Sequence, residues 1–233
     1  MNRRLEPAVA SVQEAKHGPQ DDPWEAAYLA FETPEQEINK FVRRLIELGG
    51  PEWPRDAQIV ELFCGRGNGL QALRRMGFTH IEGVDLSPTL LAQYSGDAKC
   101  HVSDCRQLPF QTGSKDVLIV QGGLHHLPTL PDDLEQVLAE MQRVLKTGGR
   151  VVIVEPWLDP FLRFVHAVSG ISLACVLSKK LDALATMIRH ERRTYEQWLS
   201  QPKLILALSR QHFSPLQERF GWGKWNFVGI PRR

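Results

Sequence analysis

Residues Glu61-Leu62-Phe63-Cys64-Gly65-Arg66-Gly67-Asn68-Gly69 decide the fold, because a short apolar run leads there into three alternating glycines. A helical pattern follows over residues 70–76. Glycines permit a tight turn and let a ligand approach the backbone, and the start of a helix offers free N–H groups. In α/β sheets, ligands bind in the crevice at the carboxyl ends of the strands. The stretch therefore predicts a strand–loop–helix unit that binds a ligand.

The sequence around this unit alternates between strand and helix patterns. Apolar runs predict strands at 57–63, 80–85, 100–102, 116–120 and 150–154, with helices at 70–76, 87–94 and 131–145. Continuous apolar strands separated by helices are typical of a parallel sheet covered on both faces. Residues 214–230 predict two antiparallel strands that close the sheet. We expect a three-layer α/β sandwich with a mostly parallel seven-stranded sheet and an antiparallel last strand.

The rest of the chain divides by composition. Residues 1–22 are polar and interrupted by Pro and Gly, so we expect a mobile lead-in. We expect residues 23–233 to form one domain, with a helical cover at 23–50, a ligand-binding core at 57–156, a helical insertion at 157–209 and closing strands at 210–233. We also expect Trp198, Trp222 and Trp225 to pack in the sheet and core.

Composition excludes several classes of protein. The chain has 233 residues, of which 42% are hydrophobic and 24% charged, and this is ordinary for a globular domain. The four cysteines stand at no metal-ligand spacing, so we predict no metal site and reduced thiols in the cytoplasm. The longest apolar stretch, residues 161–177, is interrupted by Arg163 and His166 and predicts no integral membrane segment. The N-terminus has no apolar core behind its arginines, so we expect no targeting segment.

The net charge of +1 hides an asymmetry between the two parts of the chain. Residues 1–156 carry 16 basic and 22 acidic side chains, whereas residues 157–233 carry 12 basic and 5 acidic ones. The basic C-terminal third can attract an anionic partner, although a solvated basic face is commoner.

Acidic residues near the glycines narrow the choice of ligand. The spacing G-x-G-x-G departs from the dinucleotide fingerprint G-x-G-x-x-G. Glu61, inside the first strand, would repel a pyrophosphate but could hold an ammonium group. Asp85, at the end of the second strand, could accept hydrogen bonds from both ribose hydroxyls, each worth roughly 1.5–3 kcal/mol. With Asp104 placed to meet an adenine edge, the sequence favours a cationic adenosine ligand.

At these residues the chain resembles the class I S-adenosylmethionine-dependent methyltransferases, in particular the small-molecule group. The resemblance covers residues 57–156 and follows the family's motif order: the glycine stretch, Gly83-Val84-Asp85-Leu86-Ser87, residues 104–110, residues 116–120, Leu124-His125-His126-Leu127 and residues 145–149. The family usually has Pro where Thr147 stands, a departure that leaves the turn intact. The resemblance implies a Rossmann-like fold, S-adenosylmethionine as cofactor and S-adenosylhomocysteine as product.

The resemblance also implies roles toward the methionine and ribose parts of the cofactor. Gly65, Gly67 and Gly69 would line this portion. Glu61 would lie near the methionine end, directly or through water. Gln121, after the fourth strand, is expected to contact the methionine part.

On the adenosine side, the resemblance assigns Asp85 to the ribose hydroxyls and Leu86 to one face of adenine. Asp104 would face the adenine amino group, and Cys105 would supply a backbone N–H.

The implied reaction is transfer of a methyl group to an O, N or C nucleophile. The methyl group is already activated by the sulfonium to which it is bound. The enzyme can therefore contribute mainly by positioning, which lowers the barrier by ~7–11 kcal/mol when the reactants are well oriented. His125 and His126 are candidate general bases, because family acceptors sit after the fourth strand and imidazole titrates near neutral pH. The alternative is that they only pack or cap the loop. Tyr28 and Phe31, from the helical cover, are expected to help cover the cofactor.

The acceptor is expected to be a small, largely apolar molecule, because residues 157–177 are strongly apolar. The basic C-terminal third is also compatible with an acceptor that carries a negative charge. Residues 121–124 do not form the Pro-Pro loop typical of base N-methylation, and no Pro-Cys dipeptide occurs. These features argue against nucleic acid. Two alternatives stay open: an RNA or protein methyltransferase that uses the basic third, and an inactive cofactor-binding scaffold. The sequence makes no prediction about the oligomeric state.

Overall fold

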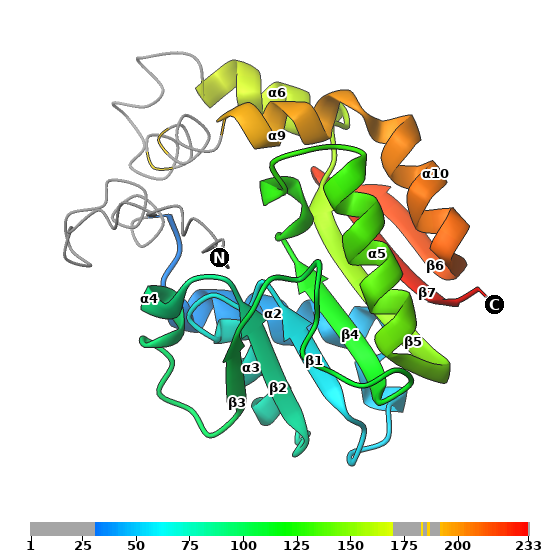
Figure 1. The fold of residues 1–233 in the computed structure, drawn as a ribbon. Coiled ribbons are helices and arrows are strands. Elements are labelled where there is room, and N and C mark those ends of the chain that lie inside the picture. Colours follow the sequence, from blue (N-terminus) through cyan, green and yellow to red (C-terminus); the bar gives the residue numbers. More distant parts are fainter. Residues whose placement is uncertain (1–30, 170–182, 184–185, 187–191, 233) are drawn as a thin grey trace, which may run out of the picture.

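The structure, a computed structural model, describes residues 31–169, 183, 186 and 192–232. The predicted lead-in at 1–22 and Tyr28 lie outside these residues. Seven strands form one sheet in the order β3-β2-β1-β4-β5-β7-β6 (Figure 1). Neighbouring strands are parallel from β3 to β5, and β7 is antiparallel to both β5 and β6. The predicted sandwich with its mostly parallel sheet and antiparallel last strand is confirmed.

The described elements follow the predicted alternation. The strands are β1 (Ile59–Leu62), β2 (Ile81–Asp85), β3 (Lys99–Val102), β4 (Lys115–Gln121), β5 (Leu145–Pro156), β6 (Phe213–Gly221) and β7 (Lys224–Pro231). The helices are α2 (Pro34–Glu47), α3 (Asn68–Arg75), α4 (Pro88–Leu91), α5 (Asp132–Val144), α6 (Pro160–Ser169), α9 (Arg192–Ser200) and α10 (Pro202–His212), with short 3-10 turns η1 (Gly50–Glu52) and η2 (Leu124–His126). Among these helices, none is both long enough and apolar enough to cross a bilayer.

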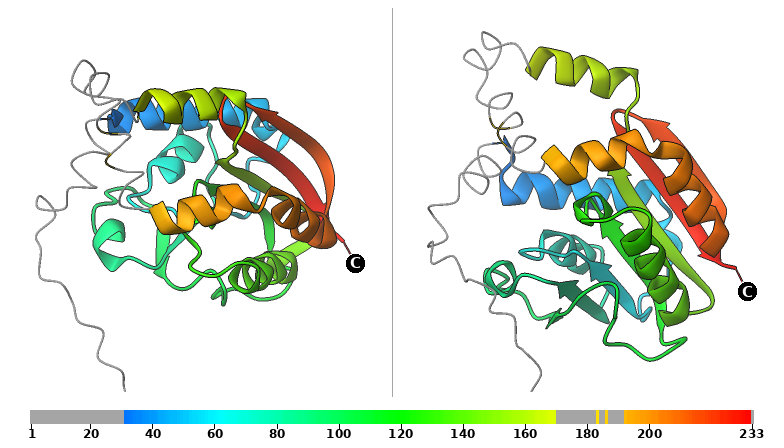
Figure 2. Two further views of the ribbon diagram at one scale, coloured as in Figure 1. Left: turned by 90° about the horizontal axis from the view of Figure 1, so that it is seen from above. Right: turned by 45° about the horizontal axis from the view of Figure 1, so that its top comes forward.

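Two apolar clusters bury the two faces of the sheet. Successive side chains of a strand point to opposite faces, so alternate residues of β1 and β4 enter different clusters. Ile59 and Ile119 pack with side chains of α2 and α3, whereas Leu62 and Val120 pack with α5 and α10. Figure 2 shows α2 and α3 on one side of the sheet and α5, α9 and α10 on the other. This arrangement leaves the carboxyl ends of the parallel strands as the place for a ligand.

The helical cover begins as its sequence predicts. The Thr33 hydroxyl accepts a hydrogen bond from the backbone N–H of Gln36, and the Gln36 side chain accepts one from the Thr33 N–H, which closes a capping box. Pro34 occupies the first turn. The helix packs alongside α3, so it lies over the face that contains the glycine loop.

The helix predicted over residues 87–94 is shorter in the structure. It ends at Leu91, because the next N–H groups bond three residues back, from Gln93 to Leu90 and from Tyr94 to Leu91. This tighter turn is followed by a hydrogen bond from the Ala98 N–H to the Tyr94 hydroxyl. The fifth strand is longer than predicted and runs from Leu145 to Pro156.

The prediction for Trp222 is wrong, whereas Trp198 and Trp225 are buried as expected. Trp222 is 81% exposed, because it forms the turn between β6 and β7 with Gly223. Both turn residues have positive φ, 54° and 70°, as a two-residue type I′ hairpin requires.

The predicted helical insertion contains α6, α9 and α10 in its described part. Figure 1 shows α6 and α9 beyond the carboxyl ends of β4 and β5. The hairpin holds the start of the insertion, since the Trp157 N–H donates to the Gly223 carbonyl and the Gly223 N–H donates to the Asp159 carboxylate. The insertion therefore lies next to the edge of the sheet where ligands are expected.

Candidate functional site

The loop after β1 is held in an unusual backbone conformation. Phe63 has φ of 55°, a left-handed value that is costly for a bulky residue, and Gly65 and Gly67 follow with φ of 51° and 79°. The Phe63 ring packs against Gly123, where an added Cβ would lie 2.3 Å from the ring. Phe63 is thus fixed by the loop after β4, and the two loops position each other.

Asp85 connects the end of β2 to the glycine loop. Its Oδ2 accepts the backbone N–H of Gly65 at 2.8 Å, and its Oδ1 accepts the N–H of Ser87 at 2.8 Å. A carboxylate oxygen has two lone pairs, so each oxygen keeps capacity for a further donor. Leu86, beside it, is 67% exposed. Two sugar hydroxyls next to a flat apolar ring would suit this surface.

Glu61 is a buried acid on the face of β1 that α2 covers. Its side chain is 3% exposed, and burial raises its pKa to about 8. Oε1 accepts a long hydrogen bond from Gln121 Nε2 at 3.4 Å, whereas the buried Oε2 has no partner among the described residues. A Cβ at Gly69 would lie 1.8 Å from Oε1, so glycine is needed there. An orphaned buried carboxylate is suited to a cation.

The structure gives three predicted residues surroundings that the sequence did not predict. Gly67 packs against the ring of Tyr94, 2.2 Å from the position of an added Cβ. The Asp104 carboxylate pairs with Arg106 at 2.6 Å, and the hydrogen bond from this guanidinium lowers the pKa of Asp104. Cys105 is buried, and burial raises the pKa of its thiol to about 12.

Gln121 joins the helical cover to the buried acid. Its Oε1 accepts a hydrogen bond from Arg44 Nη1 of α2 at 3.1 Å, while its Nε2 faces Glu61. A cation, an amide and a carboxylate therefore follow one another from α2 through β4 to β1. Phe31, the first described residue, is partly buried.

The two predicted histidines occupy different environments. His125 is buried, and its Nδ1 lies 2.7 Å from Oε2 of Glu155, whereas His126 is exposed, with its ring centroid 4.1 Å from that of His125. Oε1 of Glu155 accepts the backbone N–H groups of Gly123 and Leu124 at 2.8 and 2.7 Å.

Burial by itself would raise the pKa of the Glu155 carboxyl, but the charge of His125 and these three hydrogen bonds hold it below its ordinary value. Because the carboxylate accepts the proton on Nδ1, Nε2 is the nitrogen of His125 that can exchange a proton.

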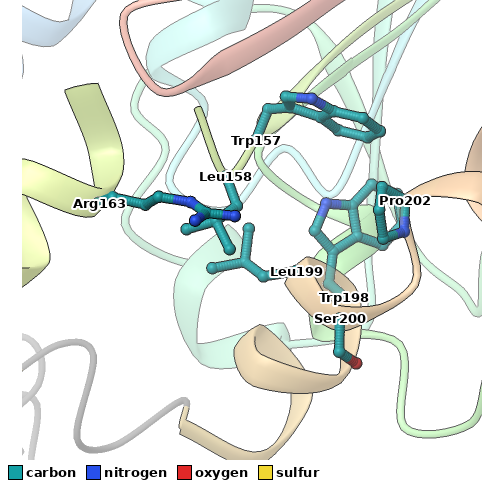
Figure 3. Close-up of a pocket in the computed structure, with 7 residues that line it drawn as sticks. All are labelled: Trp157, Leu158, Arg163, Trp198, Leu199, Ser200 and Pro202. Atoms are coloured by element: carbon teal, nitrogen blue, oxygen red, sulfur yellow. The ribbon is translucent and has the colours of Figure 1, made fainter. Parts of the chain in front are cut away.

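Helices α6 and α9 meet over these histidines. The Tyr195 ring lies edge-on to His125 with centroids 5.9 Å apart, and its hydroxyl is 3.2 Å from His166 Nε2. Beside them is a pocket of about 320 Å³, toward which Arg163 points from α6 (Figure 3). The pocket is lined by Trp157, Leu158, Arg163, Trp198, Leu199, Ser200 and Pro202. It contains no residue of the glycine loop and lies on the side of the insertion.

Sequence reasoning missed four residues of this site: Phe63, Glu155, Arg44 and Tyr195. Glu155 had a visible signal, because it is a single acid that follows an apolar strand and precedes Pro156. The other three depend on contacts between segments far apart in the chain, which no local pattern reports.

Part of the chain is similar to known methyltransferases. Residues 60–153 match the model of a family described as "Methyltransferase domain". A ubiquinone/menaquinone biosynthesis C-methyltransferase of Geotalea daltonii is 31% identical over 122 residues, which are 48% of this chain and 50% of that protein. A demethylmenaquinone methyltransferase of Clavibacter sepedonicus is 26% identical over 170 residues, 70% of this chain and 67% of its own length. The chain thus spans about half to two thirds of these relatives.

Solved structures show the same fold at low sequence identity. A Pyrococcus horikoshii protein of 19% identity has a TM-score of 0.67 and covers 91% of this chain and 99% of its own. A putative S-adenosylmethionine-dependent methyltransferase of Methanococcus maripaludis, 12% identical, has a TM-score of 0.62 and covers 96% and 98%.

Proposed function

We propose that this chain, which carries a class I S-adenosylmethionine-dependent methyltransferase domain, transfers the cofactor's methyl group to a small, largely apolar acceptor. The observation that carries the proposal is Glu61, a buried carboxylate with an orphaned oxygen beside the glycine loop. Such a carboxylate is costly to bury without a cation, and the cofactor's methionine part presents an ammonium group.

The residues present fit this cofactor. Glu61 would hold the ammonium group, Asp85 the ribose hydroxyls and Leu86 one face of the adenine. Among the described residues, an added Cβ at Gly65 would meet only Leu90, at 4.0 Å, so a ligand can approach the backbone there.

Further cofactor contacts belong to the same proposal without a direct structural argument. We keep them as predictions for Gly67, Gly69, Asp104, Cys105, Gln121, Tyr28 and Phe31.

Positioning is the main contribution that we assign to the protein. When bound, S-adenosylmethionine supplies a methyl group on a positively charged sulfur. Glu61 and Asp85, on neighbouring strands, would fix the two ends of the ligand and so orient the methyl group toward the insertion. An oriented reactant pair is worth ~7–11 kcal/mol of barrier.

His125 is the proposed general base. As the bond from the acceptor nucleophile to the methyl carbon forms, the bond from sulfur to that carbon breaks and its electron pair stays on sulfur. His125 Nε2 takes the proton that the nucleophile loses, and Glu155 stabilises the resulting imidazolium through Nδ1. Glu155 is thus a positioning residue. His126, exposed beside it, is the second candidate base.

We propose a hydroxylated aromatic acceptor as the first class to test. The lining of the pocket between α6 and α9 is mostly apolar. The two relatives described above are named as a ubiquinone/menaquinone biosynthesis C-methyltransferase and a demethylmenaquinone methyltransferase. Removal of a phenolic proton raises the electron density of a ring, which assists both O- and C-methylation.

The free thiols of Cys64, Cys100 and Cys105 suit the cytoplasm as the compartment.

A methyl-transfer assay with labelled S-adenosylmethionine tests the proposal. The acceptors are a naphthalenediol, a phenol and an aromatic amine, and mass spectrometry detects the products. We expect a methylated aromatic product and a lower kcat for His125→Gln, with Asp56→Asn as an exposed control. A protein that binds S-adenosylhomocysteine but methylates none of these acceptors would contradict the proposal and favour the inactive scaffold.

A further inference from the structure

Lys224 lies at the carboxyl end of the sheet on the face that α2 covers. It begins β7 opposite Pro156, the last residue of β5. Side chains alternate along a strand, so Lys224 shares a face with Val228, which packs in the cluster under α2. Trp225 packs in the cluster on the other face. Lys224 therefore points to the same side of the sheet as α2.

No hydrogen bond or ion pair joins the side chain of Lys224 to another residue of the described part of the chain. The charges close enough to influence the Lys224 ammonium group are those of Arg44, Lys40 and Glu32 on the α2 side, and that of Glu155, whose side chain lies on the other face of the sheet. Burial is the largest cause of the pKa of Lys224 being lowered to about 8.

The charges around Lys224 do not neutralise it. Glu32 pairs with Lys40, and Glu155 pairs with His125. Arg44 has the neutral amide oxygen of Gln121 as its hydrogen-bond partner. Two partly buried cations, Arg44 and Lys224, thus lie on the α2 side of the sheet without a bonded carboxylate among the described residues.

The order of the strands separates Lys224 from the cofactor's amino-acid end. β4 and β5 lie between β1 and β7, and strands are spaced about 4.8 Å apart, so Lys224 begins about 14 Å across the sheet from Glu61. The carboxylate of the cofactor is attached to the same carbon as its ammonium group and would stay near Glu61 and Gln121. The cofactor would therefore leave Lys224 free to bind the negative charge of a second ligand.

We propose that Lys224, with Arg44 as the second cation, binds a carboxylate of the acceptor and so selects acceptors that combine an apolar body with a negative charge. Two cations match the two oxygens of a carboxylate, and charge-assisted hydrogen bonds are the strong ones. The inference rests on the proposed function and specifies its acceptor class.

Calorimetry on the full chain saturated with S-adenosylhomocysteine tests this site. The probes are 2-naphthoate and its neutral analogue 2-naphthamide. Lys224→Met should weaken naphthoate binding by about tenfold or more, a loss of about 1.4 kcal/mol, and leave naphthamide and S-adenosylhomocysteine binding unchanged. Lys203→Met, an exposed lysine on α10, serves as the matched control, and Lys224→Arg should retain naphthoate binding because it keeps the charge.

The pH dependence supplies a second readout. Naphthoate affinity of the unmodified chain should fall between about pH 7 and about pH 9, as Lys224 loses its proton, and Lys224→Met should not show this fall. Unchanged naphthoate affinity in Lys224→Met, an equal loss for naphthamide, or loss of S-adenosylhomocysteine binding would overturn the inference. No naphthoate binding by a protein that binds S-adenosylhomocysteine overturns it alone, whereas failure to bind S-adenosylhomocysteine contradicts the proposed function.

Discussion

Three carboxylates of the site behave differently because their donors differ. Among the described side chains, Gln121 alone donates to Glu61, through a long hydrogen bond. Asp85 accepts two backbone N–H groups, and Glu155 accepts two backbone N–H groups and an imidazole. Donors stabilise the ionised form and burial destabilises it. Glu61 is therefore suited to a ligand cation, Asp85 to ligand hydroxyls and Glu155 to holding a neighbouring side chain.

Glu61→Gln should stabilise the protein in mild alkali and weaken cofactor binding. The pKa of Glu61 is raised from 4.5 to about 8, so its favourable contribution is complete below pH 4.5 and is lost as the pH rises toward 8. Thermal unfolding should give Glu61→Gln a higher Tm than the unmodified chain near pH 8 and no advantage near pH 4.5. Glu52→Gln, at an exposed site, is the control.

In our proposal, the ammonium group of the cofactor binds the ionised form of Glu61. S-adenosylhomocysteine affinity of the unmodified chain should therefore rise between about pH 6 and about pH 8. An affinity that does not change over this range, or that survives Glu61→Gln, would refute the assignment of the ammonium group.

Asp85→Asn should weaken S-adenosylhomocysteine binding by about tenfold or more, since hydrogen bonds to a charged acceptor are worth roughly 1.5–3 kcal/mol. The amide keeps the size of the side chain and can still accept one of the two backbone N–H groups. Calorimetry measures the change, with the exposed Asp56→Asn as control. Equal affinities for the unmodified and Asp85→Asn chains would contradict the ribose assignment.

At the scale of elements, Glu155 fixes η2 against the end of β5. Glu155→Gln leaves a donor facing His125 and removes a buried charge, and breaking a buried pair of this kind costs about 3–5 kcal/mol. Hydrogen exchange at the Gly123 and Leu124 amides should accelerate, and kcat should fall with a shifted pH profile.

The acid dependence of stability checks the same contact. Because the folded pKa of Glu155 is lowered, its contribution is present above the ordinary carboxyl pKa and is lost as the pH falls through the folded value. The stability gap between Glu155→Gln and the unmodified chain should therefore narrow in acid. A gap that stays constant down to acid pH would argue against this pairing.

Helix α9 is anchored by Trp198, whose Nε1 donates to the Pro156 carbonyl at 2.9 Å. Trp198→Phe removes this hydrogen bond and part of a fully packed side chain, so urea unfolding should report a loss of about 1–3 kcal/mol. Trp222→Phe, at a site 81% exposed, should change stability by less than about 0.5 kcal/mol. Similar losses for the two variants would contradict the anchoring role.

Elements with a local signature could be predicted from the sequence. The α2 capping box, the glycine loop and the β6–β7 hairpin all depend on residues within a few positions of one another. The length of α4 could not, because it depends on a turn that carries Tyr94 onto Gly67. Glu61 and Asp85 also have a local signature, because Glu61 precedes the glycine loop and Asp85 ends a strand, so the sequence could propose them as ligand-binding acids. The contacts of Arg44 with Gln121 and of Glu155 with His125 could be found only from the fold.

Over the whole molecule, the acidic residues 1–156 and the basic residues 157–233 contribute different charged side chains to the candidate site. The acidic part contains Glu61, Asp85 and Glu155, and the basic part contributes Lys224. An RNA methyltransferase would instead use the basic third as a broad surface, and its polyanion binding would weaken steeply with salt. We favour the small-molecule reading, because Lys224 is partly buried on the α2 side of the sheet and not part of an exposed basic face.

In the proposed function, cofactor binding by the whole chain depends on the strained loop, the two acids and the helical cover together. Calorimetric titration of S-adenosylmethionine into the full chain measures it directly. We expect saturable binding at one site per chain, weakened by both Glu61→Gln and Asp85→Asn. Absence of binding at millimolar cofactor, in a chain whose circular dichroism shows the folded α/β domain, would contradict it.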